Sequence, residues 1–296
     1  MIRLAGVQKN FGARPAVERL DLHVPAGEIF GLLGHNGAGK STAIGMMLGQ
    51  VWPTAGEIKI CGFDVAARRQ KALQNVGAIF ETPVFYDYLS AWRNLEIFSH
   101  YTAPTPRARI GEVIEWVGLK GREQSAVKTF SHGMRARLAL AQALLPQPQL
   151  LILDEPSDGL DPEGIHEMRQ TIQRLHGELG LTILLSSHLL NEVEQLCTRI
   201  AVLNHGRKVF EGTLAETMRK KNRVRLVVRD FAAATIELRA AKLISEATDG
   251  KFISLADGVS TSQVVRQLVA RGMDVFEIAP EAQTLEDFYL SLMKQQ

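Results

Sequence analysis

The stretch GHNGAGKST, at positions 34–42, constrains the fold of this chain more than any other feature. It fits the pattern G-x-x-x-x-G-K-[ST], and it follows the strand-like EIFGLLG and opens the helix-like STAIGMMLG, as the pattern requires. By average residue frequencies, a chance match occurs about once per hundred chains of this length, before a strand and a helix are required. The stretch therefore predicts a strand–loop–helix unit of an α/β fold that binds phosphate groups.

The chemistry of this loop assigns roles to its residues. Its glycines let backbone N–H groups wrap around phosphates, Lys40 reaches the β and γ phosphates of a nucleotide, and the Ser41 hydroxyl can ligate Mg²⁺. We predict His35 to be a tolerated loop residue rather than a catalyst. The predicted nucleotide-binding residues of the loop are Gly34, His35, Asn36, Gly37, Ala38, Gly39, Lys40, Ser41 and Thr42.

A second segment, LLILDE at positions 150–155, supplies two carboxylates at the end of an unbroken apolar run. Such a run is typical of a buried strand of a parallel sheet. Asp154 can hold the metal, and Glu155 can polarise an attacking water as general base. An Asp-Glu pair at a strand end is common by itself, but its combination with the phosphate-binding loop indicates nucleotide hydrolysis.

FSHGM, at positions 130–134, stands directly before the apolar, helix-like RARLALAQALL. Ser131 is a good N-cap, and the positive end of the helix that it opens attracts anions. Most capped helices bind nothing, so the segment by itself predicts only a helix start.

Alternating strand-like and helix-like segments imply a largely parallel sheet with helices on its faces. After about Lys221 the pattern changes to a βαββαβ order, which is typical of a small ferredoxin-like α+β domain. We therefore predict two domains: residues 1–220, with a helical subdomain at about 84–147, and residues 221–296, whose role stays open.

Composition limits the partners and the compartment. The net charge is +2, from 34 basic and 32 acidic residues, and this balance gives no indication of a nucleic-acid partner. With Cys61 and Cys197 as the only cysteines, we expect two buried thiols in a reducing compartment. The N-terminal residues lack a signal-peptide core and no 18 apolar residues run together, so we expect a cytoplasmic chain that does not cross a membrane.

At this point the sequence resembles the nucleotide-binding subunit of ATP-binding cassette (ABC) transporters, over about residues 1–213. In that family a signature turn, usually LSGGQ, precedes a helix and then the Asp-Glu strand, and FSHGM occupies that place. The family packs two subunits head to tail, so the resemblance implies that this turn closes over ATP bound by a partner chain. The implied contact residues are Ser131, His132, Gly133 and Met134.

Further family motifs occur in order. Phe11 stands where an aromatic ring stacks on adenine, although a lone Phe is more often a core residue. SDGLDP resembles the D-loop, which places Asp161 in communication across the dimer. His188, in LLSSH, matches the histidine that contacts the γ-phosphate and helps to hold the water, although a histidine after an apolar strand is usually structural.

The sequence departs from the family pattern at three positions. His132 and Met134 replace the first Gly and the Gln of the usual signature, so hydrogen bonding from a Gln side chain is lost. In VGAIFETP, Glu81 stands where the family has a glutamine; an ionised Glu accepts hydrogen bonds but cannot donate one. Glu81 could ligate Mg²⁺ directly or through water, and whether it tunes hydrolysis or only replaces the Gln stays open.

An aromatic stretch follows Glu81 and contains Phe85, Tyr86, Tyr88 and Trp92. In the family this region receives a short helix of the membrane subunit, and aromatic residues are enriched in interface cores. We predict a partner surface here, with a core role open for one or two of these rings. E-x-P at positions 81–83, S-x-G-M at 131–134 and the late LEDFYLSLM resemble the ATPase subunits of ABC-2 exporters, including the drug and lantibiotic branches.

The resemblance implies a P-loop NTPase core of the ABC type, with an antiparallel β edge and a helical subdomain, joined to the small C-terminal domain. It implies an ATPase that uses ATP and Mg²⁺, dimerises head to tail with a second copy or a paralogous subunit, and powers a separate multi-span membrane permease as an exporter. Such a subunit lies at the cytoplasmic face of the membrane and uses no nucleic acid. The alternative is a soluble regulatory ABC ATPase without a transport role; a P-loop kinase does not explain FSHGM or His188.

Overall fold

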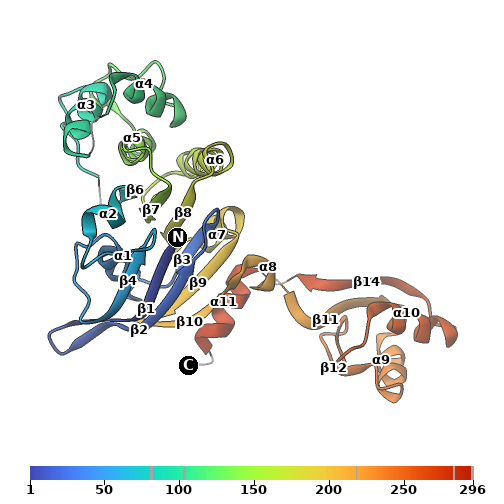
Figure 1. Ribbon diagram of the computed structural model, residues 1–296. Coiled ribbons are helices and arrows are strands. Elements are labelled where there is room, and N and C mark those ends of the chain that lie inside the picture. Colours follow the sequence, from blue (N-terminus) through green and yellow to red (C-terminus); the bar gives the residue numbers. More distant parts are fainter. Residues whose placement is uncertain (81–82, 103–104, 218, 283, 295–296) are drawn as a thin grey trace. The chain divides into compact units, whose positions relative to one another are not determined.

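The computed structural model describes residues 1–80, 83–102, 105–217, 219–282 and 284–294. The chain divides into two compact units (Figure 1). Met1–Leu214 and Leu292–Gln296 form the first, and Ala215–Ser291 form the second. The division at Ala215 lies a few residues before the boundary expected at 221, and the end of the chain groups with the first unit.

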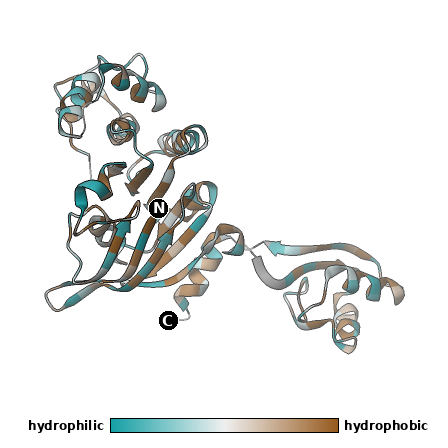
Figure 2. Cartoon of the chain, in the orientation of Figure 1, coloured by the Kyte–Doolittle hydropathy of each residue, from teal (hydrophilic) through white to brown (hydrophobic). Residues whose placement is uncertain are grey.

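A six-stranded sheet forms the centre of the first unit, in the order β10-β9-β3-β8-β7-β6. All neighbouring strands are parallel except β10, which pairs antiparallel with β9. Its strands are β3 (Ile29–Leu33), β6 (Val76–Ile79), β7 (Leu150–Asp154), β8 (Thr182–Ser187), β9 (Arg199–Asn204) and β10 (Arg207–Thr213). Every residue of β3, β7 and β8 is buried, which explains their nearly continuous apolar sequences, and Figure 2 shows hydrophobic colour along the central strands.

An antiparallel sheet accompanies it, in the order β2-β1-β4-β5. Its strands are β1 (Ile2–Phe11), β2 (Arg14–Val24), β4 (Ala55–Ile60) and β5 (Phe63–Asp64). From Leu20 to Val24, buried and exposed residues alternate along β2, as expected for a strand with one face in the core. This is the antiparallel β edge that the family resemblance implied.

The helices of the first unit lie in the segments that connect its strands. They are α1 (Lys40–Met47), α2 (Arg69–Leu73), α3 (Ala91–Thr102), α4 (Arg107–Trp116), the 3₁₀ turn η1 (Val127–Thr129), α5 (His132–Leu144), α6 (Pro162–Leu179) and α7 (Leu190–Leu196). The helices α3, α4 and α5 fall within the segment predicted to be helical, and α5 contacts β6 and α6. The short helix α8 (Leu214–Thr217) spans the division between the units.

Three loops of functional interest begin at one edge of the central sheet. In the β3–β8 pairing Leu33 lies opposite Ser187, and in the β7–β8 pairing Asp154 lies opposite Ser186. Because β3, β8 and β7 are neighbours and parallel, their carboxyl ends meet at this edge. The parallel topology thus brings together segments that are far apart in the sequence, at the usual ligand edge of an α/β sheet.

The second unit has one four-stranded antiparallel sheet, in the order β12-β13-β11-β14. Its elements are β11 (Arg219–Val228), α9 (Phe231–Ala240), β12 (Ile244–Thr248), β13 (Phe252–Leu255), α10 (Thr261–Ala270) and β14 (Val275–Ala282). Buried residues from the sheet and from both helices form a separate core, among them Leu226, Leu238 and Leu268. The chain then continues into α11 (Leu285–Lys294).

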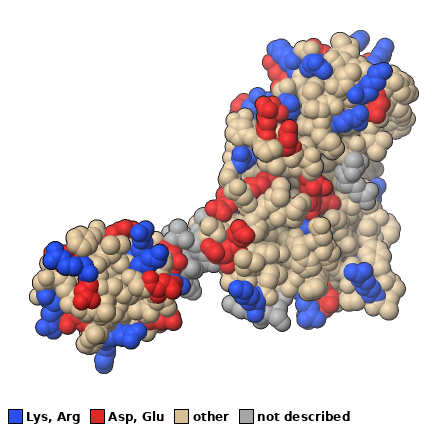
Figure 3. Space-filling view, turned by 180° about the vertical axis from the view of Figure 1, so that it is seen from behind, with Lys and Arg blue, Asp and Glu red and all other residues tan. Residues whose placement is uncertain are grey.

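Three predictions from composition can be compared with the structure: the mixed surface charge, the burial of the cysteines and the lack of a membrane-spanning helix among the described residues. Figure 3 shows Lys and Arg among Asp and Glu on both units in that view, so charge picks out no single face there. Cys197 is buried as expected, whereas Cys61 is only partly buried. Among the residues that the structure describes, no helix combines the length and the apolarity that crossing a membrane requires.

Candidate active site

The loop at positions 34–42 has the backbone that a phosphate cradle needs. Gly39 has φ 103°, in the left-handed region, and a Cβ there would lie 2.7 Å from the carbonyl oxygen of Ala16. A Cβ on Gly34 would lie 2.7 Å from the carbonyl oxygen of Leu203. Both positions therefore exclude other residues, because the loop passes close to neighbouring backbone.

The side chain of His35 links this loop to the central sheet. Its Nδ1 lies 2.7 Å from the carbonyl oxygen of Asn36, and its Nε2 lies 3.0 Å from Oδ1 of Asn204. Asn204 ends β9, so the contact ties the loop to a neighbouring strand of the central sheet. The contact gives His35 a structural role, and its having no catalytic role stays a prediction.

Lys40 is almost completely buried, at 4 % exposure, and its ammonium is paired within the chain. Its Nζ donates to the carbonyl oxygen of Gly34 at 2.7 Å and lies 3.2 Å from Oε1 of Glu155. A buried ammonium needs such partners. The same three-donor group can serve phosphate oxygens that enter the loop.

Glu155 follows β7 with φ 47°, the left-handed region that a residue other than Gly rarely adopts. Such a conformation costs on the order of 1–2 kcal/mol and is concentrated at functional sites. Its N–H donates to Oγ of Ser186 at 3.0 Å, and the same hydroxyl donates to Oδ1 of Asp154 at 2.5 Å. Ser186 thus holds both carboxylate-bearing residues from the adjacent strand β8.

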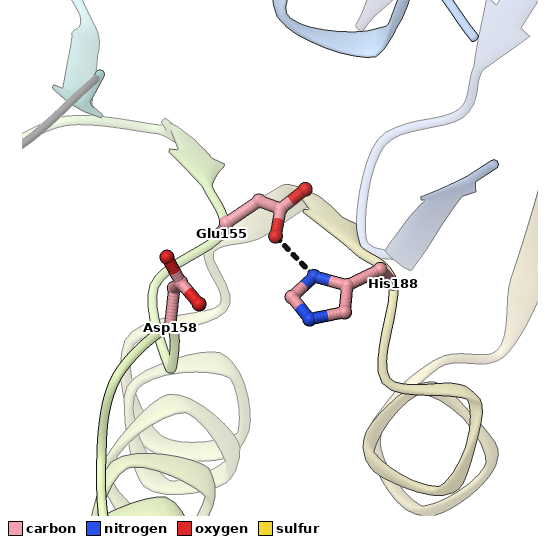
Figure 4. Close-up of side chains that lie close together, drawn as sticks. All are labelled: Glu155, Asp158 and His188. Atoms are coloured by element: carbon pink, nitrogen blue, oxygen red, sulfur yellow. Dashed lines mark hydrogen bonds and ion pairs between the residues drawn. The ribbon is translucent and has the colours of Figure 1, made fainter. Parts of the chain in front are cut away.

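The side chains of Glu155 and His188 are in direct contact, and Asp158 lies beside them (Figure 4). Nδ1 of His188 hydrogen-bonds to Oε2 of Glu155. Burial alone would raise the pKa of Glu155, but the hydrogen bonds from His188 and Lys40 and the charge of Lys40 outweigh it, so its pKa lies below the usual value. Glu155 is thus a carboxylate at neutral pH, as a general base must be.

Two sets of side chains could hold a cation. Glu155, Asp158 and His188 each offer a ligand atom within 4.8 Å of the others. However, the ammonium of Lys40 already lies on Glu155, and it opposes a second cation there. Ser41 and Asp154 line one cavity and offer the hard oxygen ligands that Mg²⁺ prefers.

Two adjoining cavities open over these residues. The larger, of about 730 Å³, is lined by Asn36 and Ser41, by the loop after β7, by His188, and by His132 of α5. The second, of about 450 Å³, is lined by residues of the phosphate-binding loop and by Phe11. Both lie in the size range of small-molecule sites. Phe11 is 53 % exposed, with Nζ of Lys9 4.8 Å above its ring, so it is not a core residue.

The FSHGM turn opens α5 as the sequence predicts. Oγ of Ser131 accepts a hydrogen bond from the N–H of Met134 at 3.2 Å, so Ser131 is the N-cap of this helix. His132 and Ser131 are exposed. A Cβ on Gly133 would lie 3.6 Å from Cα of Gly164, which shows that the turn packs near the start of α6.

Asp161, the predicted D-loop residue, has a local partner. Its Oδ1 accepts from the N–H of Gly164 at 2.8 Å, which makes Asp161 the N-cap of α6, followed by Pro162 at the first helical position. Its role across a dimer stays a prediction. Glu81, the predicted Q-loop residue, lies outside the described residues.

The aromatic stretch after Glu81 splits between core and surface. Phe85 is only 8 % exposed, and its ring lies 6.1 Å from that of Phe98 in α3, so Phe85 is a core residue and not part of an exposed surface. Tyr88 is 73 % exposed, and Tyr86 is also exposed. A core role for one of these rings was the alternative left open by the sequence.

Sequence reasoning missed the polar residues that support the site. Ser186, Ser157, Ser187 and Glu192 are buried and hydrogen-bonded around Asp154, Glu155 and His188. One sequence signal could have found two of them. Ser186 and Ser187 follow the apolar run Ile183–Leu185 in a strand expected to be buried, and buried hydroxyls need hydrogen-bond partners. Their partners could not be assigned without the fold.

Fold and site together define a nucleotide-binding protein of the P-loop class. Comparisons with known proteins identify the family within this class. Residues 17–158 match the family model described as ABC transporter. The chain is 38% identical over 293 residues to the ABC transporter ATP-binding protein YhcH of Bacillus subtilis, covering 99% of this chain and 95% of that protein. It is 36% identical over 298 residues to the bacitracin transport ATP-binding protein BcrA of Bacillus licheniformis, covering 99% and 97%.

The chain therefore belongs to the ATP-binding proteins of ABC transporters, and it is an ATPase of that family. A solved structure with the same fold is cbiO1 from Clostridium perfringens, described as part of the ABC transporter complex cbiONQ. The TM-score is 0.67 at 26% identity, over 73% of this chain and 89% of that one. The family assignment agrees with the resemblance carried by the P-loop, the FSHGM turn and His188.

Proposed function

We propose that this chain is the ATP-hydrolysing subunit of an ABC exporter, and that two chains close head to tail around ATP to drive a separate membrane permease. The observation that carries the proposal is the cluster of Lys40, Glu155 and His188 at the carboxyl edge of the central sheet, beside the cavity of about 730 Å³. The cluster joins a phosphate-binding cation to a carboxylate base and a histidine.

Within one chain, the phosphate-binding loop and Lys40 hold the β and γ phosphates, and Phe11 stacks on adenine at the other cavity. Base stacking on an aromatic ring contributes about 1–3 kcal/mol in comparable sites. Ser41 and Asp154, with Glu81 as a further ligand, would hold Mg²⁺, which would supply neutralising charge to the phosphates. Lys40 leaves Glu155 for the phosphates, which frees the carboxylate.

Glu155 and His188 then act on the attacking water. Glu155 accepts a proton from the water, and the hydrogen bond from His188 favours its ionised form after Lys40 has left. His188 lies against Glu155 and holds the water and the γ-phosphate in line. A general base of this kind contributes about 10²–10⁴ in rate.

The partner chain completes the site with its FSHGM turn. Ser131 and the N–H of Gly133 contact the γ-phosphate at the positive end of α5, with His132 and Met134 beside them. Because Met134 lacks the side-chain donor of the usual Gln, this half of the site depends on Ser131 and on backbone N–H groups. Asp161 lies in the loop that meets the partner.

We propose the exporter role because the full-length relative BcrA is named for bacitracin transport and the chain covers 97% of it. The exposed Tyr86 and Tyr88 form part of the surface that receives the permease, and the chain then lies at the cytoplasmic face of the membrane through that contact. The partner ATPase is a second copy or a paralogous subunit. For residues 221–296, the strand order and the antiparallel pairing support a ferredoxin-like domain.

The deciding experiment is light scattering of the Glu155→Gln protein with and without MgATP, beside the double variant Glu155→Gln, Ser131→Arg. The first variant binds ATP without hydrolysing it, so we expect an ATP-dependent dimer. The bulky cation at Ser131 blocks the shared site, so the double variant should stay monomeric while it still binds ATP. A dimer that forms equally in both variants, or brisk turnover by Glu155→Gln, would contradict the proposal.

A further inference from the structure

Glu192, in α7, has a buried carboxylate that joins two loops of the active site. The residue is only 4 % exposed. Its Oε1 accepts a hydrogen bond from Oγ of Ser157, and its Oε2 accepts one from Oγ of Ser187 at 2.9 Å. Both serines are also buried, so this contact lies beneath the loops and away from solvent.

Each serine belongs to a different functional segment. Ser157 follows Glu155 by two positions and opens the SDGLDP loop that ends at Asp161. Ser187 is the last residue of β8 and directly precedes His188, and its Oγ also accepts from the N–H of Leu189 at 3.0 Å. Glu192 therefore holds one loop with each of its two carboxylate oxygens.

The physical chemistry of a buried carboxylate makes this link stiff. A buried carboxylate left without donors is strongly destabilising, so both serine hydroxyls are held pointing at Glu192. A shift of either loop alone would break one of the two hydrogen bonds. The lower-cost motion keeps both bonds and moves the two loops together.

We propose that Glu192 is a positioning residue that couples the segment 156–161 to the segment 187–189. It keeps His188 against Glu155, and it transmits a displacement of His188 to the loop that contains Asp161. This inference rests on the proposed function, because it assumes that Glu155 and His188 act on the water. Within the part of the chain that the structure describes, Glu192 hydrogen-bonds to the two serines and to neither Glu155 nor His188.

The first test replaces Glu192 by Met, which has similar length and no strong acceptor, and by Gln, which can still hydrogen-bond to both serines. ATPase rates are normalised to the number of nucleotide-binding sites, so that misfolded protein does not count. We expect Glu192→Met to lower kcat by about tenfold or more, with KM changed by less than about twofold, because displaced catalytic groups lose rate rather than binding. Glu192→Gln should recover part of kcat.

The matched control is Gln195→Ala, on the exposed side of the same helix, which should keep the parental kcat and KM. A folded Glu192→Met protein with the parental kcat would overturn the inference, and so would a loss confined to KM. If Glu155→Gln also keeps turnover, the proposed function itself has failed. If Glu155→Gln is inactive but the Glu192 variants are unaffected, only this inference has failed.

A second measurement keeps the inference testable if Glu192→Met does not fold. Ser157→Ala, Ser187→Ala and the double variant are compared for kcat. Coupling through Glu192 predicts a double effect that departs from the product of the single effects by about threefold or more. If the effect of the double variant on kcat equals the product of the two single effects within about twofold, the two loops act independently and the inference is overturned.

Discussion

The strand-end cluster of Lys40, Glu155 and His188 and the FSHGM turn on α5 differ in how their polar groups are satisfied. In the cluster, side chains from three separate segments pair with one another, and Glu155 contacts both Lys40 and His188. In the turn, Ser131 caps its own helix three residues away. One region is assembled by the fold, while the other is satisfied locally and faces solvent.

This difference indicates that the two regions contribute to different steps, nucleotide binding and chemistry in the cluster and dimer closure in the turn. The cluster has its charges, its strained Glu155 backbone and its supporting hydroxyls in place within one chain, so we expect a single chain to bind nucleotide. The FSHGM turn has the positive end of a helix and an exposed Ser131, but its hydrogen bonds are internal to the turn. We therefore expect substitutions in the cluster to affect binding or chemistry in each chain, and substitutions in the turn to affect closure.

The largest expected effect is that of Lys40→Ala. The variant loses the ammonium that we propose serves the phosphates, and hydrogen bonds to charged groups contribute about 1.5–3 kcal/mol each. We expect ATP binding to weaken by about a hundredfold and turnover to fall below detection, as measured by nucleotide titration and phosphate release. Lys59→Ala, on the antiparallel sheet, is the control. Unchanged affinity in Lys40→Ala would remove the cluster from phosphate binding.

A pair of Ser131 variants separates capping from anion binding. Asp is as good an N-cap as Ser, but its charge repels a phosphate, so Ser131→Asp should keep its thermal stability and lose about tenfold or more in turnover. Ala cannot cap, so Ser131→Ala should lose about 1 kcal/mol of stability while the backbone donors preserve more of the turnover. Parental turnover in Ser131→Asp would mean that the turn only caps α5.

A smaller effect is expected in the pH dependence of stability. Since the folded pKa of Glu155 lies below its usual value of 4.5, its pairing stabilises the protein fully above that value and is lost as the pH falls through the folded pKa. The melting temperatures of the parent and Glu155→Gln should therefore differ most near neutral pH, and the difference should shrink progressively as the pH falls below the usual pKa of 4.5. A difference that is constant over this range would show that Glu155 gains nothing from its partners.

The smallest effect on the isolated protein is expected for Tyr88→Ala, because the ring is exposed. Basal ATPase and melting temperature should stay within error, while co-purification of the permease should fall. Phe85→Ala is the contrasting variant, since truncation of a buried Phe costs about 3–5 kcal/mol of stability. Retained co-purification with Tyr88→Ala would place the permease contact elsewhere.

Sequence reasoning located the elements of the site because their signals are local. The spacing of Gly34, Gly39 and Lys40 is contained in one loop, and the unbroken apolar run before Asp154 and Glu155 indicates a buried parallel strand. It placed Ser131 at a helix start for the same reason. It could not sort Phe85 from Tyr88, since burial depends on whether Phe98 of α3 lies against the ring.

The sequence by itself determined where the glycine-rich loop and the helix cap lie, because each is built by consecutive residues. Only the tertiary structure decided how those residues are held. Ser186 reaches Asp154, and Glu192 reaches Ser157 across 35 positions of sequence, because neighbouring parallel strands end at one edge. Buried polar groups must find donors and acceptors wherever the fold supplies them, and that choice is set by strand order.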